Sequence, residues 1–134
     1  MAQLSPAARA FLEERRFSIF ADINADGTPH LTVLWYALEG EVVMFNTAQG
    51  RVKDKNLHRD NRASVCVEDG DRYVTINGAC TLQGDDQEAA QADILSLAIR
   101  YEGEEAGRKM AADFRNQERE TIRLSIESVD EHGF

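Results

Sequence analysis

The sequence is poor in cysteine and has no long run of apolar residues. Its two cysteines, Cys66 and Cys80, lack the CxxC spacing of common zinc and redox motifs. We expect both to be reduced residues of a hydrophobic core. No apolar run approaches the roughly 18 residues of a membrane span, and residues 1–16 lack the apolar stretch of a signal peptide. No membrane partner is therefore expected, and the expected location is cytoplasmic.

Positive charge is also scarce. The chain has 15 Lys and Arg residues against 24 Asp and Glu residues, which gives a formal net charge of -9. Nucleic-acid-binding proteins generally need a basic surface, so no nucleic-acid partner is expected. The length of 134 residues and the 43% hydrophobic content suit one folded domain over residues 1–134. An anionic ligand would need a local exception to the acidic balance.

The distribution of apolar residues predicts six strands and four helices. Period-two alternation and β-branched or aromatic content predict the strands, at 17–23, 30–38, 41–47, 62–68, 73–82 and 121–129. Helical spacing predicts the helices, at 5–16, 51–58, 86–101 and 104–115. Gly78, inside the fifth strand, indicates a bulge or a close backbone approach. We expect a mainly β (α+β) fold, an antiparallel barrel with short peripheral helices, because closure hides the edge strands.

One segment, from Arg51 to Arg62, is positively charged within this acidic chain. This segment holds five basic residues and two acidic ones, a local charge of +3. Arg51 and Lys53 fall in the first turn of the helix expected at 51–58, where the macrodipole favours acidic side chains. A bound phosphate would resolve this conflict, because it accepts hydrogen bonds from the turn and from both side chains. The alternative is a solvated surface, which is the usual role of a charge run.

Other catalytic or metal-binding patterns are not evident. The three histidines are scattered over a turn, a helix and the C-terminal tail, without the carboxylate or cysteine spacing of a metal site: His30, His58 and His132. We therefore predict no metal. No nucleophile motif such as GxSxG is present, so no catalytic side chain is assigned.

Several motifs together resemble the pyridoxamine 5'-phosphate oxidase-like split barrels. They are Asp-Gly-Thr-Pro-His at 26–30, Trp-Tyr at 35–36, Asn-Thr-Ala at 46–48, Gly-Arg-Val-Lys at 50–53 and Asn-Leu-His-Arg-Asp at 56–60. Within that superfamily the chain is similar to the flavin/deazaflavin oxidoreductase B group, many of whose members use coenzyme F420. The resemblance implies a six-stranded antiparallel split β-barrel. It also implies a homodimer with the cofactor in a groove between the two barrels.

The resemblance further implies the residues of a cofactor site. The cofactor phosphate would lie on Arg51 and Lys53, and the strand around Trp35 would run along the tricyclic ring. The implied cofactor-binding residues are Val33, Leu34, Trp35, Asn46, Thr47, Gly50, Arg51, Lys53 and Asn56. For Trp35 an alternative stays open, since aromatic residues are also enriched in cores and dimer interfaces.

The function implied is hydride transfer from reduced F420 to an unsaturated or conjugated small molecule. Direct transfer between stacked partners requires orientation and exclusion of water rather than an acid–base pair. This agrees with the lack of an evident catalytic side chain. Two alternatives stay open: an FMN-dependent oxidoreductase of the same fold, and a protein that binds a flavin or deazaflavin without turnover.

Overall fold

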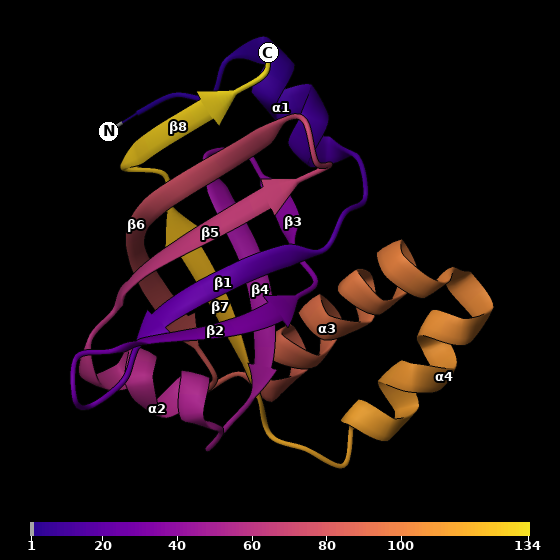
Figure 1. Cartoon of the computed structure of the whole chain (residues 1–134). Coiled ribbons are helices and arrows are strands. Elements are labelled where there is room, and N and C mark those ends of the chain that lie inside the picture. Colours follow the sequence, from indigo (N-terminus) through magenta and orange to yellow (C-terminus); the bar gives the residue numbers. More distant parts are fainter. Residues whose placement is uncertain (1) are drawn as a thin grey trace.

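The computed structural model describes residues 2–134, which form eight strands and four helices. The strands are β1 Ser18–Ile23, β2 Pro29–Leu34, β3 Ala37–Glu39, β4 Val42–Ala48, β5 Arg62–Glu68, β6 Tyr73–Gln83, β7 Arg119–Ser125 and β8 Ser128–His132. The helices are α1 Pro6–Glu13, α2 Val52–Arg59, α3 Gln87–Glu102 and α4 Glu104–Phe114. The strands curl into a barrel, with α2 near one end and α3 and α4 to one side (Figure 1). None of these helices is long and apolar enough to cross a membrane.

The strands of the described chain pair in antiparallel fashion, in the order β2-β1-β5-β6-β7-β4-β3, and β8 pairs with β6. The long strand β6 joins two halves, because residues 73–77 pair with β8 and residues 80–83 pair with β7. Between them, a Cβ on Gly78 would stand 1.8 Å from the carbonyl oxygen of Ser125. The close backbone approach predicted at Gly78 is therefore confirmed.

The predicted fold class is confirmed, but the strands number eight rather than six. The strand predicted over 30–38 is interrupted at Trp35 and Tyr36 and becomes β2 and β3, at opposite ends of the strand order. The N–H of Tyr36 donates to Oη of Tyr101 at 3.2 Å, and its carbonyl accepts from Nε of Arg100 at 3.0 Å. Side chains of α3 thus replace strand hydrogen bonds at the interruption.

The strand predicted over 121–129 is also divided, into β7 and β8. The division falls at Ile126 and Glu127, directly after Ser125 has passed over Gly78. From there the chain turns to pair with the first part of β6. A continuous strand would have stayed beside β4, so the interruption is what lets one apolar segment serve both halves of the barrel.

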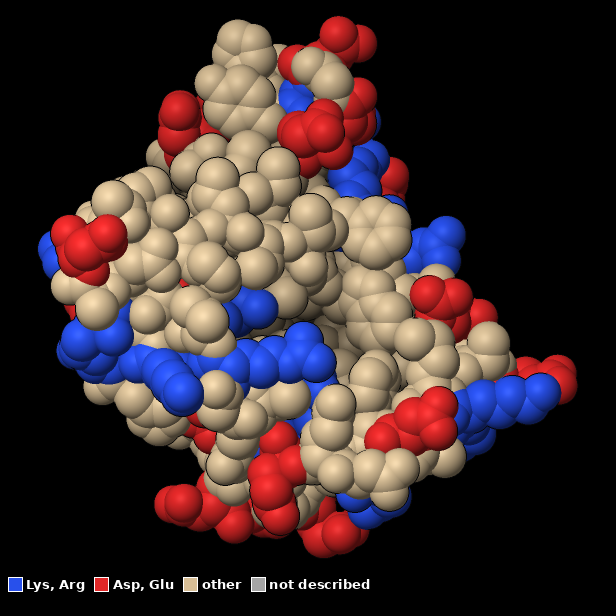
Figure 2. Space-filling view, turned by 60° about the horizontal axis from the view of Figure 1, so that its bottom comes forward, with Lys and Arg blue, Asp and Glu red and all other residues tan. Residues whose placement is uncertain are grey.

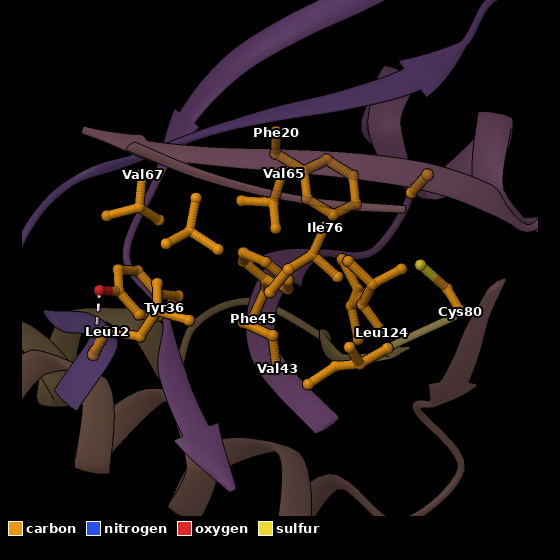
Figure 3. Packing of buried hydrophobic residues seen from close by; sticks show 14 of the residues in the cluster. Leu12, Phe20, Tyr36, Val43, Phe45, Val65, Val67, Ile76, Cys80 and Leu124 are labelled. Atoms are coloured by element: carbon orange, nitrogen blue, oxygen red, sulfur yellow. Dashed lines mark hydrogen bonds between the residues drawn. The ribbon is translucent and has the colours of Figure 1, made fainter. Parts of the chain in front are cut away.

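The barrel interior holds the apolar core drawn in Figure 3. Phe20 of β1 and Phe45 of β4 are fully buried and meet edge to face, with ring centroids 4.8 Å apart. Tyr36 is also fully buried, and its hydroxyl donates to the carbonyl of Leu12 at 2.9 Å. This hydrogen bond is needed because a buried hydroxyl without a partner destabilises the folded state.

The two cysteines are both free, but they lie in different environments. Cys80 belongs to the core, as predicted, and burial raises the pKa of its thiol to about 12. The same prediction is wrong for Cys66. It lies half-buried on the outer face of β5, where it pairs in register with Ile19 of β1. The alternation of β5 explains the difference, because its core face is taken by Ala63, Val65 and Val67.

Candidate functional site

A cleft of about 250 Å³ opens beside β2, β4 and the start of β7, next to α3 and α4. Its lining consists of Val33, Leu34, Trp35, Asn46, Thr47, Ala48, Arg51, Lys53, Ile94, Leu97, Met110, Phe114 and Arg119. Most of these side chains are apolar or aromatic, and three are cationic. Figure 2 shows Lys and Arg side chains gathered along a hollow, beside a wide surface without charged side chains.

The start of α2 brings two of the cations to the cleft. Arg51 is the N-cap residue, with an extended backbone and no capping hydrogen bond from its side chain. Lys53, in the first turn, points inward and is only 6% exposed. The carboxylate of Asp54 accepts the N–H of Gly50 at 2.8 Å. The backbone at this turn is therefore held by Asp54, and the side chains of Arg51 and Lys53 line the cleft.

Arg119 supplies the third cation, and sequence analysis missed it. Arg119 begins β7 and is 6% exposed. Its Nε donates to Oδ1 of Asn46 at 2.9 Å, and its guanidinium lies 4.8 Å from the ring centroid of Phe114. In the sequence it stands among the charged and amide residues at 115–120, a composition typical of a surface loop. Its burial depends on cover from α4, and no local pattern indicates that contact.

The pKa values of Lys53 and Arg119 are both lowered, and the charge of Arg51 contributes to each shift. Burial lowers the pKa of Lys53; Asp22 opposes this shift, whereas Arg51 and Arg119 add to it. Burial, with a further contribution from Arg51, lowers the pKa of Arg119 to about 10, so this side chain is still charged at neutral pH. Among residues 2–134, none of the three forms an ion pair with a carboxylate. Cations grouped in this way attract an anion.

A second hollow, of about 430 Å³, adjoins the cleft through Arg51 and Lys53, which line both. Its other lining residues are His30, Thr32, Gly50 and Val52. Oγ1 of Thr32 is buried and has no hydrogen-bond partner within residues 2–134. Because an unpaired buried hydroxyl is unfavourable, this position has an unused capacity to bind a polar group of a ligand.

The structure places the nine residues that the sequence assigned to a cofactor in three different environments. Seven of them line the first cleft, and Gly50 lines the second hollow. Asn56 lines neither. Its amide nitrogen donates to Asp22 at 2.7 Å and to Asn24 at 3.1 Å, and its oxygen accepts from Arg59 at 2.8 Å. These bonds place Asn56 in a network that ties α2 to β1 and the following turn.

Aromatic side chains border the apolar part of the cleft. The ring of Trp35 stacks on that of Tyr101 from α3, with centroids 5.3 Å apart and planes inclined by 11°. The ring centroid of Phe17 also lies near Tyr101, at 5.6 Å. Trp35 therefore packs against a helix and lines the cleft at once. Its position is compatible with both of the roles that the sequence left open.

An exposed apolar surface continues from the cleft across β1 and β2. Its side chains keep much of their area in solvent: Phe17 62%, Ile19 43%, Leu31 62% and Val33 65%. Ile19 pairs in register with Val33, and Ala21 pairs with Leu31, so these residues form one patch. A contiguous patch of this kind typically marks a contact with another protein or a ligand.

A protein-family profile matches nearly the whole chain, including the residues of the cleft. The profile described as pyridoxamine 5'-phosphate oxidase matches residues 4–133. The chain belongs to this family. The match confirms the resemblance first indicated by the motifs around Trp35 and Arg51.

Relatives of this pyridoxamine 5'-phosphate oxidase family member are known in structure and in sequence. A conserved hypothetical protein of Mycobacterium tuberculosis has a similar structure, with a TM-score of 0.80 and 29% identity over 97% of this chain and 85% of that chain. A structure named F420 reductase gives a TM-score of 0.76 at 23% identity, over 95% and 98% of the two chains, and shows the fold alone. An F420H(2)-dependent biliverdin reductase of Mycobacterium tuberculosis is 28% identical over 101 residues, 74% of this chain and 73% of that protein.

Proposed function

We propose that this chain is an oxidoreductase that binds reduced coenzyme F420 in the cleft and passes hydride to an unsaturated or conjugated small molecule. The observation that carries the proposal is that an aromatic and apolar lining adjoins three cations, none of which forms an ion pair among residues 2–134. The lining suits a ring system, and the cations suit a phosphate. Similarity to an F420H(2)-dependent biliverdin reductase favours a deazaflavin over FMN.

In this proposal the start of α2 binds the cofactor phosphate. Lys53 is already buried, so a charge-assisted hydrogen bond from its Nζ is stronger than one at an open surface. Arg51 lies at the mouth of both hollows, and the unpaired hydroxyl of Thr32 offers a further contact beside Lys53. Arg119 of β7, whose Nε donates to Asn46, adds a third positive charge to the cleft.

The apolar lining would orient the ring and exclude water. Val33, Leu34 and Trp35 form one side, and Met110 and Phe114 of α4 form another. When bound, the reduced deazaflavin supplies the hydride. The protein then needs to hold the acceptor against the ring and to keep water away.

We further propose that a homodimer completes the site. A volume of about 250 Å³ is smaller than the roughly 300–1,000 Å³ of typical small-molecule sites. Val33 lies both in the cleft and on the exposed apolar patch, so a second copy docked on the patch would close the cleft. Sedimentation should therefore give about twice the 15.0 kDa of one chain. A monomer that binds the cofactor at full strength would contradict a shared site.

Titration with F420 and, separately, with FMN tests the cofactor site. Each charge-assisted contact is worth about 1.5–3 kcal/mol, so Arg51→Ala and Lys53→Ala should each weaken binding by about tenfold to more than a hundredfold. Lys55→Ala is the matched control, because Lys55 lies on the same helix but is exposed and lines neither hollow. Its replacement should change affinity only through salt-dependent long-range attraction.

The possible results separate the alternatives. If both variants bind as tightly as the parent, the phosphate lies elsewhere. Tighter binding of FMN than of F420 would favour the FMN-dependent enzyme. A protein that binds reduced F420 but oxidises it with none of a panel of conjugated acceptors, biliverdin included, would be a carrier rather than a catalyst.

A further inference from the structure

Asp54, His58 and Glu120 form a cluster that takes no part in the cleft. Asp54 and Glu120 are the sequence neighbours of Lys53 and Arg119, and strand alternation directs Glu120 to the face of β7 opposite Arg119. One donor atom from each of the three residues lies within 4.8 Å of the others. Nε2 of His58 is 2.7 Å from Oε1 of Glu120 and 3.3 Å from Oδ1 of Asp54.

The surrounding backbone holds the two carboxylates in place. The N–H of Gly50 donates to Oδ2 of Asp54 at 2.8 Å, which leaves Oδ1 on the side of the histidine. A Cβ on Gly84 would stand 1.9 Å from Oε2 of Glu120, so the absence of a side chain there makes room for the carboxylate. Asp54 and Glu120 are 6% and 4% exposed. The two carboxylates are therefore held by the fold, and His58 approaches them from the surface.

One carboxylate oxygen of the cluster lies 3.3 Å from Nε2 of His58 but makes no hydrogen bond. Oδ1 of Asp54 is buried and has no hydrogen-bond partner among residues 2–134. A protonated His58 does not remove the difficulty, because Nε2 carries a single hydrogen and Glu120 is the nearer acceptor. Two buried carboxylates therefore face a single imidazole.

We propose that Asp54, His58 and Glu120 bind a divalent transition-metal ion of the Zn²⁺ type. One imidazole nitrogen and two carboxylate oxygens form a donor set that Zn²⁺ accepts, whereas Ca²⁺ and Mg²⁺ prefer oxygen ligands throughout. Bonds of about 2.0–2.2 Å place neighbouring donors of a tetrahedral site ~3.3–3.6 Å apart. The distances of 2.7 and 3.3 Å from Nε2 of His58 to the two carboxylates are at or somewhat below this spacing, and the His58 side chain is 59% exposed and free to adjust.

Sequence analysis predicts no metal because the histidines lack ligand spacing. The fold nevertheless brings three possible ligands together. Asp54 and His58 are one helical turn apart on α2, and Glu120 comes from β7, far along the chain. An ion at this point would fasten α2 to β7. Since it would bind the folded protein, it would also raise the stability of the fold. The inference does not depend on the cofactor proposed for the cleft.

Calorimetric titration of the 134-residue chain with Zn²⁺, after treatment with a chelator, tests the proposal. We expect one equivalent per chain, a higher Tm with Zn²⁺, and visible absorption bands when Co²⁺ is used instead. Asp54→Asn, His58→Ala and Glu120→Gln should each weaken Zn²⁺ binding by about tenfold or more. His132→Ala is the matched control, because it removes a histidine of β8 that stacks on Tyr73 and lies outside the cluster.

Several results would overturn the assignment. One is the absence of stoichiometric Zn²⁺ and Co²⁺ binding, and another is binding that survives all three substitutions or is abolished by His132→Ala. Glu120→Gln and Asp54→Asn keep the size of the side chain, and circular dichroism of each variant shows whether a loss of binding reflects unfolding. Arg51→Ala should keep full Zn²⁺ affinity, so failure at the metal site and failure at the cofactor site are distinguishable.

Discussion

The barrel interior and the cleft beside it differ in how their polar groups are satisfied. In the interior, the hydroxyl of Tyr36 donates to Leu12, and that of Ser18 donates to the carbonyl of Leu34 at 2.8 Å. At the cleft, Lys53 is buried and forms no ion pair, and Oγ1 of Thr32 has no hydrogen-bond partner in the described chain. The chain therefore completes its own hydrogen bonds where it only packs, and leaves groups unpaired where a ligand is proposed. Such sites commonly reduce stability in exchange for binding.

The largest effect is expected in the interior. Phe45→Ala removes a fully buried ring that packs on Phe20, and should lower the free energy of unfolding by about 3–5 kcal/mol at a fixed protein concentration. Urea denaturation measures this loss. Val52→Ala, at an exposed position that begins α2, should change the same quantity by less than about 0.5 kcal/mol. Equal losses at the two positions would mean that the interior is not the better packed region.

Sequence reasoning reached the interior more completely than the cleft, because the core depends on local alternation. Phe20 lies on the alternating strand β1, Phe45 lies in β4, which is buried along most of its length, and the helix starts follow from caps such as Ser5, which accepts the N–H of Ala8. The interruption at Tyr36 was not predictable in this way. Its backbone is satisfied by side chains 64 and 65 residues further along the chain, so a continuous strand was the reasonable local interpretation.

At the cleft, the residues in one motif were predictable and those from elsewhere were not. Arg51 and Lys53 stood out because basic residues are unusual in the first turn of a helix. Arg119 did not, since only the packing of α4 over the start of β7 turns an ordinary charged residue into a buried cation. Asn56 lies on the same helix as Lys53, but its side chain donates to Asp22 and does not line the cleft.

The stability of the protein at alkaline pH tests the prediction for the barrel interior, where the hydroxyl of Tyr36 is hydrogen-bonded. Burial raises the pKa of Tyr36 from 10.0 to about 12. The folded protein holds this proton more strongly than the unfolded chain, so the contribution to stability is complete below pH 10 and is lost as the pH rises towards 12. The free energy of unfolding of the parent should therefore fall more steeply than that of Tyr36→Phe over this range, by up to about 1.4 kcal/mol per pH unit.

Measurements near neutral pH provide the reference for this experiment. There the phenol is neutral in both states, so the difference between parent and Tyr36→Phe should be constant, at about 0.5–1.5 kcal/mol for the lost hydrogen bond to Leu12. Parallel curves from neutral pH to pH 12 would show that the folded protein binds the phenolic proton no more strongly than the unfolded chain. The interior would then be no better satisfied than the cleft.

The smallest effect, with the opposite sign, is expected at the cleft. Lys53 lies in the first turn of α2, where its charge opposes the helix macrodipole, and burial lowers its pKa, so its charged form is unfavourable in the empty protein. Lys53→Met keeps the length of the side chain without the charge. It should raise the free energy of unfolding without cofactor by about 0.3–1 kcal/mol and at the same time weaken cofactor binding. Lys55→Met, at an exposed position of the same helix, should change stability less and binding little. If Lys53→Met instead destabilised the empty protein, the ammonium group would be making a favourable contact within the chain. The polar groups of the cleft would then be paired within the chain at Lys53, as those of the interior are.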